Sequence, residues 1–362
     1  MAIKITQKSK AGTSLKSLLV DLQKEYGDSV GSFGGALQDA TRVPTGMFEL
    51  DMSLGGGFPR GKCSIIYGPE SSSKTNLALL AIANHQKIWP ELTCVFVDVE
   101  GSFDPKWATL LGVDCSKLVV IKPGYAEQVV DIVESILYTD DCGIVVIDSL
   151  AAMITTQEGE RSADTANVGG TGLVTGKLVR KTTLALNEAE KAGRQPTLIY
   201  INQTRMKIGV MYGNPETQPG GNAPQFQAAI RLRVYGKNIT DSKVSQVMPI
   251  SKEVTFVINK WKVPILQASG KFEMVTFAHH GLPVGYSEDF NTVSGFLRDF
   301  GQFHKGPKDK GWVILGETYD KIDQFKAKYR GDQLYATEIR QGIINKLLAG
   351  GEVSEEGGKE HD

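Results

Sequence analysis

Short apolar runs alternate with longer amphipathic segments through the middle of the chain. The runs are rich in Val, Ile, Leu and Phe and form the predicted strands, at residues 63–68, 94–100, 117–122, 143–148 and 197–203. Between them, 74–89 and 126–138 carry apolar residues at helical spacing. Buried strands separated by helices are typical of a parallel sheet that is covered on both faces. We therefore predict an α/β fold with a mostly parallel, twisted sheet.

The pattern changes twice toward the C-terminus. Three apolar runs, at 228–236, 252–260 and 272–278, follow one another without helical segments between them, which indicates antiparallel strands that extend the sheet. After about residue 284 the sequence becomes mixed and ends in a helical stretch, which predicts a small α+β domain. The last residues are acidic and poor in apolar side chains, so we expect a disordered tail.

The first 36 residues predict a helix on a flexible tether. Leu15, Leu18 and Leu22 fall on one face of a helix over residues 14–26, and the glycine-rich sequence GDSVGSFGGA follows. Such an apolar stripe must be buried, either on the chain's own core or on a neighbouring subunit. We therefore divide the chain into four parts: 1–36, 37–283, 284–350 and 351–362.

Composition and charge narrow the function classes. With 40 basic and 41 acidic side chains the formal net charge is −1, so any nucleic-acid contact must come from local patches. The four cysteines have no C-x-x-C spacing, which favours buried thiols in a reducing cytoplasm over disulfides or a metal site. Because the sequence shows neither a signal-peptide core nor a long apolar run, we expect a cytoplasmic protein without a membrane segment.

The sequence GPESSSKT differs at one position from the phosphate-binding pattern G-x-x-x-x-G-K-[ST] and lies between a predicted strand and a predicted helix. There, loop amides and the helix N-terminus converge on phosphate groups. Lys74 would reach the β- and γ-phosphates, and the Thr75 hydroxyl would bind Mg²⁺. Ser73 replaces the second glycine; if the backbone there needs a positive φ, the cost is about 1–2 kcal/mol, which phosphate-bound amides can offset. The alternative is a serine-rich turn. The candidate contacts are Gly68, Pro69, Glu70, Ser71, Ser72, Ser73, Lys74, Thr75 and Asn76.

Two carboxylates at strand ends strengthen the nucleotide hypothesis. Asp148 ends the run GIVVID, so its side chain would lie at the carboxyl edge of the sheet, where it can hold Mg²⁺ through water. Glu100 follows another strand and can orient or deprotonate a water molecule that attacks the γ-phosphate. We expect Asp98, by contrast, to have a structural role at the end of that strand. Taken singly, each carboxylate is also consistent with a solvated strand end. Together with the loop at 68–75 they indicate a nucleotide-hydrolysing site.

The loop after the predicted strand 197–203 mixes glycines, cations and sizeable apolar side chains. Such a loop could follow the phosphate backbone of a nucleic acid and insert its apolar side chains between the bases. The alternative is a disordered surface loop, although few such loops hold so many apolar residues in succession. The candidate nucleic-acid contacts are Arg205, Met206, Lys207, Ile208, Gly209, Val210, Gly220, Gly221 and Asn222.

The sequences GPESSSKT, VDVEGSFDP, VVIDSLAA and above all INQTRMKIGVMYGNPETQPGGNA resemble the RecA recombinase family, and the resemblance extends from about residue 14 to residue 290. It implies a RecA-like ATPase core that binds ATP and Mg²⁺. It further implies a homo-oligomeric helical filament on single-stranded DNA, pairing with homologous duplex DNA, strand exchange and DNA-dependent ATP hydrolysis. In the family the C-terminal domain captures duplex DNA, which the lysine-rich segment 305–330 would allow.

The resemblance also assigns roles to residues at the nucleotide. Lys74 and Thr75 correspond to the Walker A residues, Asp148 to Walker B, Glu100 to the catalytic glutamate, and Gln203 to the glutamine that senses the γ-phosphate.

Three further residues correspond to other nucleotide contacts of the family. Asp104 and Trp107 fall where the family contacts adenine, with Trp107 in place of a tyrosine. Lys260 matches the second lysine of a pair that reaches the neighbouring protomer's ATP. Ile258 replaces the first lysine, and Lys262 is the alternative cation.

The resemblance places other residues at contacts with protomers and DNA. Phe226 matches a phenylalanine of the subunit interface, and the leucine-bearing N-terminal helix resembles the one that docks on the neighbouring protomer. Lys177 and Arg180 fall near the helix that follows the first DNA loop. There, a solvated basic helix face is the alternative.

Two other functions are open at this point. One is a hexameric helicase-type motor on the same core; the other is a non-hydrolysing scaffold that binds ATP and DNA, which Ser73 and Ile258 would explain. Recombinases of T4-type phages also lack the glycine before the lysine and carry asparagine after the Ser/Thr, as Asn76 does here. This resemblance favours a phage-encoded protein expressed in the cytoplasm of a bacterial host.

Overall fold

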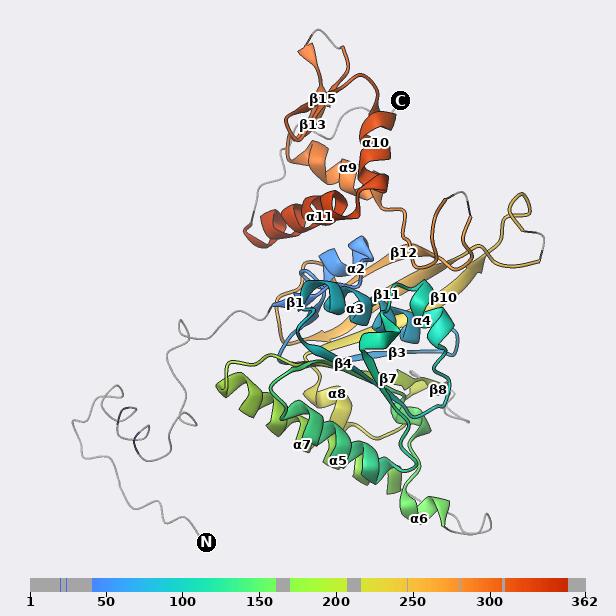
Figure 1. Cartoon of the computed structure of the whole chain (residues 1–362), viewed down its shortest axis with the longest axis vertical. Helices are drawn as coiled ribbons and strands as arrows, with labels where there is room; N and C mark the ends of the chain where they lie inside the picture. Colours follow the sequence, from blue (N-terminus) through green and yellow to red (C-terminus); the bar gives the residue numbers. More distant parts are fainter. Residues whose placement is uncertain are drawn as a thin grey trace. The chain divides into compact units, whose positions relative to one another are not determined.

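The chain divides into two units, residues 1–40 and 41–362, and Figure 1 shows the helices and strands of the second. In the computed structural model the described residues are Val20, Lys24, 41–160, 170–206, 216–245, 247–279, 281–307 and 310–350. The predicted leucine stripe of Leu15, Leu18 and Leu22 and the predicted acidic tail lie outside this part of the chain. The description below therefore concerns the second unit.

An eight-stranded sheet with the order β12–β11–β10–β3–β7–β6–β4–β5 forms the centre of this unit. All neighbouring pairs from β10 to β5 are parallel, whereas β11 is antiparallel to both β10 and β12. The prediction of an α/β fold with a mostly parallel sheet is confirmed. The strands are β3 (Cys63–Gly68), β4 (Thr93–Asp98), β5 (Leu118–Ile121), β6 (Cys142–Asp148), β7 (Thr197–Gln203), β10 (Ile230–Ile239), β11 (Ser251–Trp261) and β12 (Ser269–Val275).

The three later strands extend the sheet from β3. As expected, β10, β11 and β12 pair with one another in antiparallel order, while β10 pairs in parallel with β3, with Ile230 opposite Ser64. The chain leaves β7 at the carboxyl edge and returns to the amino edge before β10 begins. This return path cannot be read from apolar periodicity, which reports burial and not strand direction.

Helices cover both faces of the sheet, and the side chains of β6 show why. Ile144 and Val146 pack in one apolar cluster with residues of α3, whereas Val145 and Ile147 pack in a second cluster with residues of α5 and α7. A strand that is buried on both faces is apolar at nearly every position, as β6 is from Ile144 to Ile147 before it ends in Asp148. The helices and short turns of this region are α3 (Lys74–Ile88), α4 (Pro105–Leu110), η3 (Cys115–Lys117), α5 (Ala126–Leu137), η4 (Leu150–Ala152), α6 (Thr156–Gly159), α7 (Gly170–Lys191) and α8 (Ala223–Gln227).

A third apolar cluster lies in the C-terminal region. Phe290, Phe325 and Tyr329 pack there with Phe48 and Met52 of the early helix α2. Three short antiparallel strands and three helices surround the cluster. The predicted domain boundaries at residues 284 and 351 stay predictions. The elements are α2 (Phe48–Ser53), α9 (Phe290–Asp299), β13 (Phe303–Lys305), β14 (Trp312–Ile314), β15 (Glu317–Tyr319), α10 (Ile322–Gly331) and α11 (Gln333–Leu348).

Two small hairpin-like sheets complete the unit, β1 (Arg42–Val43) with β2 (Phe58–Pro59) and β8 (Arg205–Met206) with β9 (Glu216–Thr217). Cys63, Cys94 and Cys142 are buried free thiols. Among the described helices none is both long and apolar enough to cross a bilayer.

Candidate active site

The loop between β3 and α3 contains two residues with left-handed backbone. β3 ends at Gly68 and α3 begins at Lys74, with Ser73 as the N-cap of the helix. The φ angles of Ser71 and Ser73 are 57° and 72°, in the left-handed region that favours glycine. Ser73 thus adopts the strained conformation that we considered from the sequence. Its hydroxyl oxygen is buried and finds no hydrogen-bond partner in the described part of the chain.

Packing allows only glycine at position 68. A Cβ atom at this position would lie 2.1 Å from the carbonyl oxygen of Val234 on β10, a distance that no side chain can tolerate. The loop therefore leaves the sheet in close contact with the neighbouring strand. The carbonyl oxygen of Gly68 itself binds the loop that follows β7, because it accepts a hydrogen bond from the Thr204 amide at 3.1 Å.

Two ammonium groups bind carbonyl oxygens of the loop. Lys74 Nζ donates to the Pro69 oxygen at 2.6 Å, and Lys252 Nζ, on β11, donates to the Ser71 oxygen at 2.8 Å. Both lysines line a cavity of about 220 Å³ whose other walls come from residues 71–73 and 75–76. Sequence reasoning missed Lys252, because only the register of β11 brings it to this loop.

Thr75 and Asp148 meet beside the cavity. The Thr75 hydroxyl donates to Asp148 Oδ2 at 2.6 Å, which brings the first turn of α3 to the end of β6. Burial raises the pKa of Asp148 to about 6, while the Thr75 hydrogen bond opposes the shift. Asp98, opposite Asp148 in the sheet, instead accepts hydrogen bonds from the amides of Ser102 and Phe103 and thereby holds the strand end.

Glu100 connects the ends of three parallel strands. Its Oε1 accepts hydrogen bonds from Ser149 Oγ, just after β6, and from Gln203 Nε2, at the end of β7, the latter at 2.9 Å. We did not single out Ser149 from the sequence, although its place directly after Asp148 was a usable signal. The structure therefore brings Glu100 and Gln203 into direct contact.

Trp107 and Asp104 lie on α4, next to the first turn of α3. The Asp104 carboxylate caps α4 by accepting from the amides of Lys106 and Trp107. The Trp107 indole N–H donates to Asn76 Oδ1 at 2.9 Å, and its ring packs against the apolar core. Asn76, the residue after Thr75, thus links the first turn of α3 to the aromatic ring.

The predicted DNA-binding loop is described at its two ends. Arg205 and Met206 pair with β9, and Asn202 Nδ2 donates to the Pro219 oxygen at 3.0 Å. Arg233 on β10 forms an ion pair with Glu216. Four of the predicted contacts lie outside the described residues: Lys207, Ile208, Gly209 and Val210.

The far end of this loop meets α7. Gly220 and Gly221 have φ angles of 85° and 73°, and a Cβ atom on Gly220 would lie 3.1 Å from Cγ2 of Thr175. Asn222 is the N-cap of α8. On the same helix α7, Lys177 and Arg180 are exposed.

Phe226 and Lys260 lie together on another exposed part of the unit. The Phe226 side chain is 71% exposed, and Lys260 Nζ donates to the carbonyl oxygens of Gln225 and Phe226. Ile258, where the resemblance places a lysine, is buried in the core. Lys262 also binds a carbonyl of α8, that of Gln227, at 3.1 Å.

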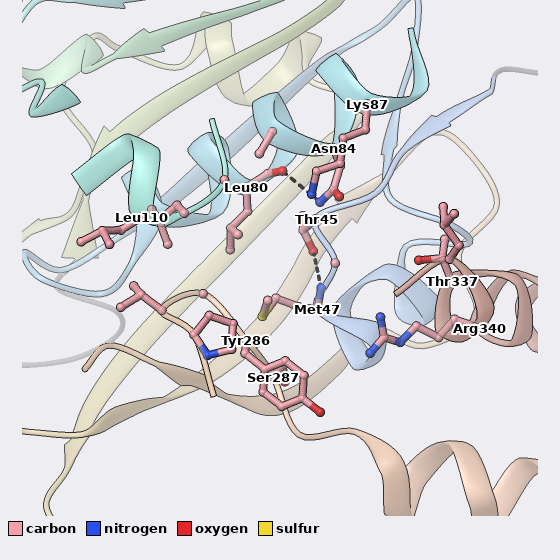
Figure 2. A pocket seen from close by; sticks show the side chains of 18 residues that line it. Thr45, Met47, Leu80, Asn84, Lys87, Leu110, Tyr286, Ser287, Thr337 and Arg340 are labelled. Carbon is pink, nitrogen blue, oxygen red and sulfur yellow. Dashed lines mark hydrogen bonds between the residues drawn. The ribbon is translucent and has the colours of Figure 1, made fainter. Parts of the chain in front are cut away.

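A larger cavity, of about 400 Å³, lies at the other end of α3 (Figure 2). Asn84 and Lys87 of α3 and Thr337 and Arg340 of α11 line it. None of the predicted site residues lines this cavity. The candidate chemistry is therefore concentrated at the smaller, polar cavity beside Lys74.

The chain is similar to several known proteins. Residues 13–277 match the family model of the RecA N-terminal domain. The chain is 35% identical to Protein RecA of Saccharopolyspora erythraea over 95% of each chain. It is 39% identical to Protein RecA of Francisella tularensis subsp. novicida over 92% of this chain and 89% of that one. A crystal structure of the RadB recombinase is similar with a TM-score of 0.47 and 19% identity, covering 64% of this chain and 96% of that one.

Proposed function

The chain belongs to the RecA family, from which we infer that it is an ATP-dependent recombinase with DNA-dependent ATPase activity. We propose that it assembles as a helical filament on single-stranded DNA, pairs that strand with homologous duplex DNA and exchanges the strands. The observation that carries this proposal is the hydrogen bond from Gln203 to Glu100. It joins the proposed hydrolytic carboxylate to the base of the proposed DNA-binding loop.

The cavity beside Lys74 suits the triphosphate of ATP. The buried hydroxyl of Ser73 lacks a protein partner in the described region, and the Lys74 ammonium group is bound to a carbonyl of its own loop. Phosphate oxygens are better acceptors for both groups. Thr75 and Asp148 would hold Mg²⁺, which when bound supplies positive charge to the phosphate oxygens.

We propose that hydrolysis depends on the orientation of Glu100. The two hydrogen bonds to Oε1, from Ser149 and Gln203, fix the plane of the carboxylate. Glu100 would orient the attacking water molecule and accept its proton, while Lys74 stabilises the negative charge on the phosphate. A change at Gln203 would reach the DNA-binding loop directly, since Arg205 begins β8 two residues later.

The adenine of ATP would lie against α4. We propose that Trp107 stacks on the base and that Asp104 and Asn76 complete this side of the site. The Asn76 hydrogen bond to the indole N–H holds the ring in one orientation.

DNA and neighbouring protomers would bind at the surfaces named above. We assign DNA binding to Lys177, Arg180 and the loop from Arg205 to Asn222, and duplex capture to residues 284–350. Phe226 is exposed and half-buried Lys260 binds its carbonyl oxygen; both would contact the next protomer, with Lys260 reaching its ATP. The stripe of Leu15, Leu18 and Leu22 would dock on a neighbour. Ser73 and Asn76 are consistent with a phage-encoded enzyme that acts in a bacterial cytoplasm.

A three-strand exchange assay with ATP and Mg²⁺ tests the proposal. We expect the wild-type chain to convert circular single strands and linear duplex into exchanged products, and Lys74→Ala to form none. Electron microscopy on single-stranded DNA should show helical filaments. Closed rings would instead identify a helicase-type motor. The absence of phosphate release that depends on Glu100, with Glu100→Gln as the control, would support the non-hydrolysing scaffold.

A further inference from the structure

We propose that Lys252 is a second cation of the nucleotide site, which binds the loop between β3 and α3 at Ser71 and contributes positive charge to the phosphate cavity. The inference rests on the function proposed above for this loop. It concerns a residue on β11, far from the sequence motifs that mark the site.

The position of Lys252 is built by the neighbouring strand. Its Nζ donates to the Ser71 oxygen at 2.8 Å, and its side chain lines the same cavity as Lys74 and Thr75. A Cβ atom on Gly236 of β10 would lie 2.9 Å from Lys252 Cδ and 3.1 Å from the Ser71 oxygen. The missing side chain at Gly236 therefore leaves the space through which Lys252 reaches the loop.

The hydrogen bond acts on the strained part of the loop. Ser71 and Ser73 both have positive φ, a conformation that strains any residue other than glycine. In a trans peptide the carbonyl and the following N–H point in opposite directions, so fixing the Ser71 carbonyl also fixes the Ser72 amide. Lys74 fixes the Pro69 carbonyl in the same way. Each ammonium group thus restrains one peptide of the loop.

The charge of Lys252 acts on the same cavity. Burial lowers the pKa of Lys252, and the pKa of Lys74 is lowered first by burial and in part by the nearby charge of Lys252. Two ammonium groups at the N-terminus of α3 form a site for a strongly anionic ligand. A polyphosphate relieves their repulsion, whereas a neutral ligand does not.

Substitution of Lys252 in the full-length chain tests the proposal. Lys252→Met removes the charge and the donor at similar volume, Lys252→Gln keeps a neutral donor, and Lys252→Arg keeps both. The matched control is Lys271→Met, a 70% exposed side chain that pairs with Glu253 on the same sheet. For each variant we would measure the Kd of Mg²⁺-ATP and of inorganic tripolyphosphate at low and high salt.

We expect Lys252→Met to raise both Kd values about tenfold, because a charge-assisted hydrogen bond is lost. The effect should shrink at high salt, since screening weakens the charge contribution. Lys252→Gln should lie between Lys252→Met and the wild type, Lys252→Arg within about threefold of the wild type, and Lys271→Met at the wild-type value. Tripolyphosphate has no base, so an equal loss for both ligands places the effect at the phosphates.

Wild-type affinity in Lys252→Met would overturn the inference, and wild-type affinity in Lys252→Gln would overturn its charge component. The thermal unfolding midpoint without nucleotide is measured for all variants. An affinity loss that merely follows the loss of folded protein would also overturn it. A wild-type chain that binds neither ligand would refute the proposed nucleotide site itself, whereas normal wild-type binding with an unaffected Lys252→Met refutes only the role of Lys252.

Discussion

The carboxyl edge of the parallel sheet and the C-terminal cluster are held together by different contacts. At the sheet edge, polar groups from distant parts of the chain meet, as in the pairs Thr75–Asp148 and Gln203–Glu100. In the C-terminal cluster, aromatic rings surround the ion pair of Arg340 with Asp289. In the first region the carboxylates accept hydrogen bonds from neutral side chains, whereas in the second the buried carboxylate forms an ion pair. Substitutions should therefore change rates at the sheet edge and stability in the cluster.

The largest effect that this comparison predicts is on turnover. Glu100→Gln should lower DNA-stimulated ATP hydrolysis by about 10³-fold, because the amide cannot accept the proton of the attacking water. ATP affinity and the unfolding midpoint should stay near the wild-type values. Steady-state phosphate release with single-stranded DNA is the measurement, with the exposed Glu91→Gln as control. A large fall in the unfolding midpoint of Glu100→Gln would show that the sheet edge also determines stability, which would contradict the difference between the two regions.

The opposite outcome is expected in the C-terminal cluster. Arg340 Nε lies 2.7 Å from Asp289 Oδ2 and 2.9 Å from the Tyr329 hydroxyl, and the Asp289 side chain is fully buried. Arg340→Met should lower the free energy of unfolding by about 3–5 kcal/mol, because it leaves a buried carboxylate unpaired. ATP hydrolysis per folded molecule should not change.

Urea unfolding followed by fluorescence measures this loss. Arg330→Met is the control, since the ion pair of Arg330 with Glu288 is partly exposed and such pairs contribute about 0–1 kcal/mol. Equal losses in the two variants would contradict the special role of the buried pair.

The buried carboxyl of Asp51 should make stability depend on pH. It accepts hydrogen bonds from Thr45 N, Thr45 Oγ1 and Gly46 N, yet burial raises its pKa from 3.8 to about 7. Between those values the folded chain keeps a proton that the unfolded chain has released, so stability falls as pH rises from about 4 to 7. Between pH 5 and pH 8 we expect a loss of roughly 2.5 kcal/mol.

Asp51→Asn should remove this part of the pH dependence. Urea midpoints of the variant and the wild type at pH 5 and pH 8 give the difference, and the exposed Asp323→Asn should behave as the wild type. If Asp51→Asn shows the full wild-type dependence, other buried carboxyls, such as Asp148, determine it.

The smallest effect is predicted at the loop itself. Ser73→Gly should relieve the left-handed strain and raise the free energy of unfolding by about 1 kcal/mol, while ATP binding and hydrolysis stay within about twofold of the wild type. Thermal unfolding and steady-state hydrolysis are the two measurements. Loss of ATP binding would show that the Ser73 hydroxyl, and not only the loop backbone, is required.

Much of the fold could be predicted because burial leaves a local signature. Residues 144–147 are apolar at every position, and they form the body of β6 with both faces covered. The loop at 68–75 was predictable for a similar reason, since its glycine, lysine and threonine follow one another in sequence. The parallel pairing of β10 with β3 was not predictable, because it depends on the path of the chain between strands.

The rest of the site depends on register rather than on local pattern. Lys252 and Ser71 are 181 positions apart and meet only because β11 pairs with β10 and β10 with β3. The contact of Trp107 with Asn76 likewise needs the relative placement of α3 and α4. No periodicity within a single segment carries such information.

The anchoring of the loop between β7 and α8 has a consequence for how such proteins diversify. Its ends are fixed by the pairing of β8 with β9, by Asn202 at Pro219, and by the packing of Gly220 on Thr175. These supports lie outside the stretch between Met206 and Glu216, so a sequence exchanged there would keep them. Under the function proposed above, such an exchange would alter the DNA contacts and leave the hydrogen bond of Gln203 to Glu100 in place.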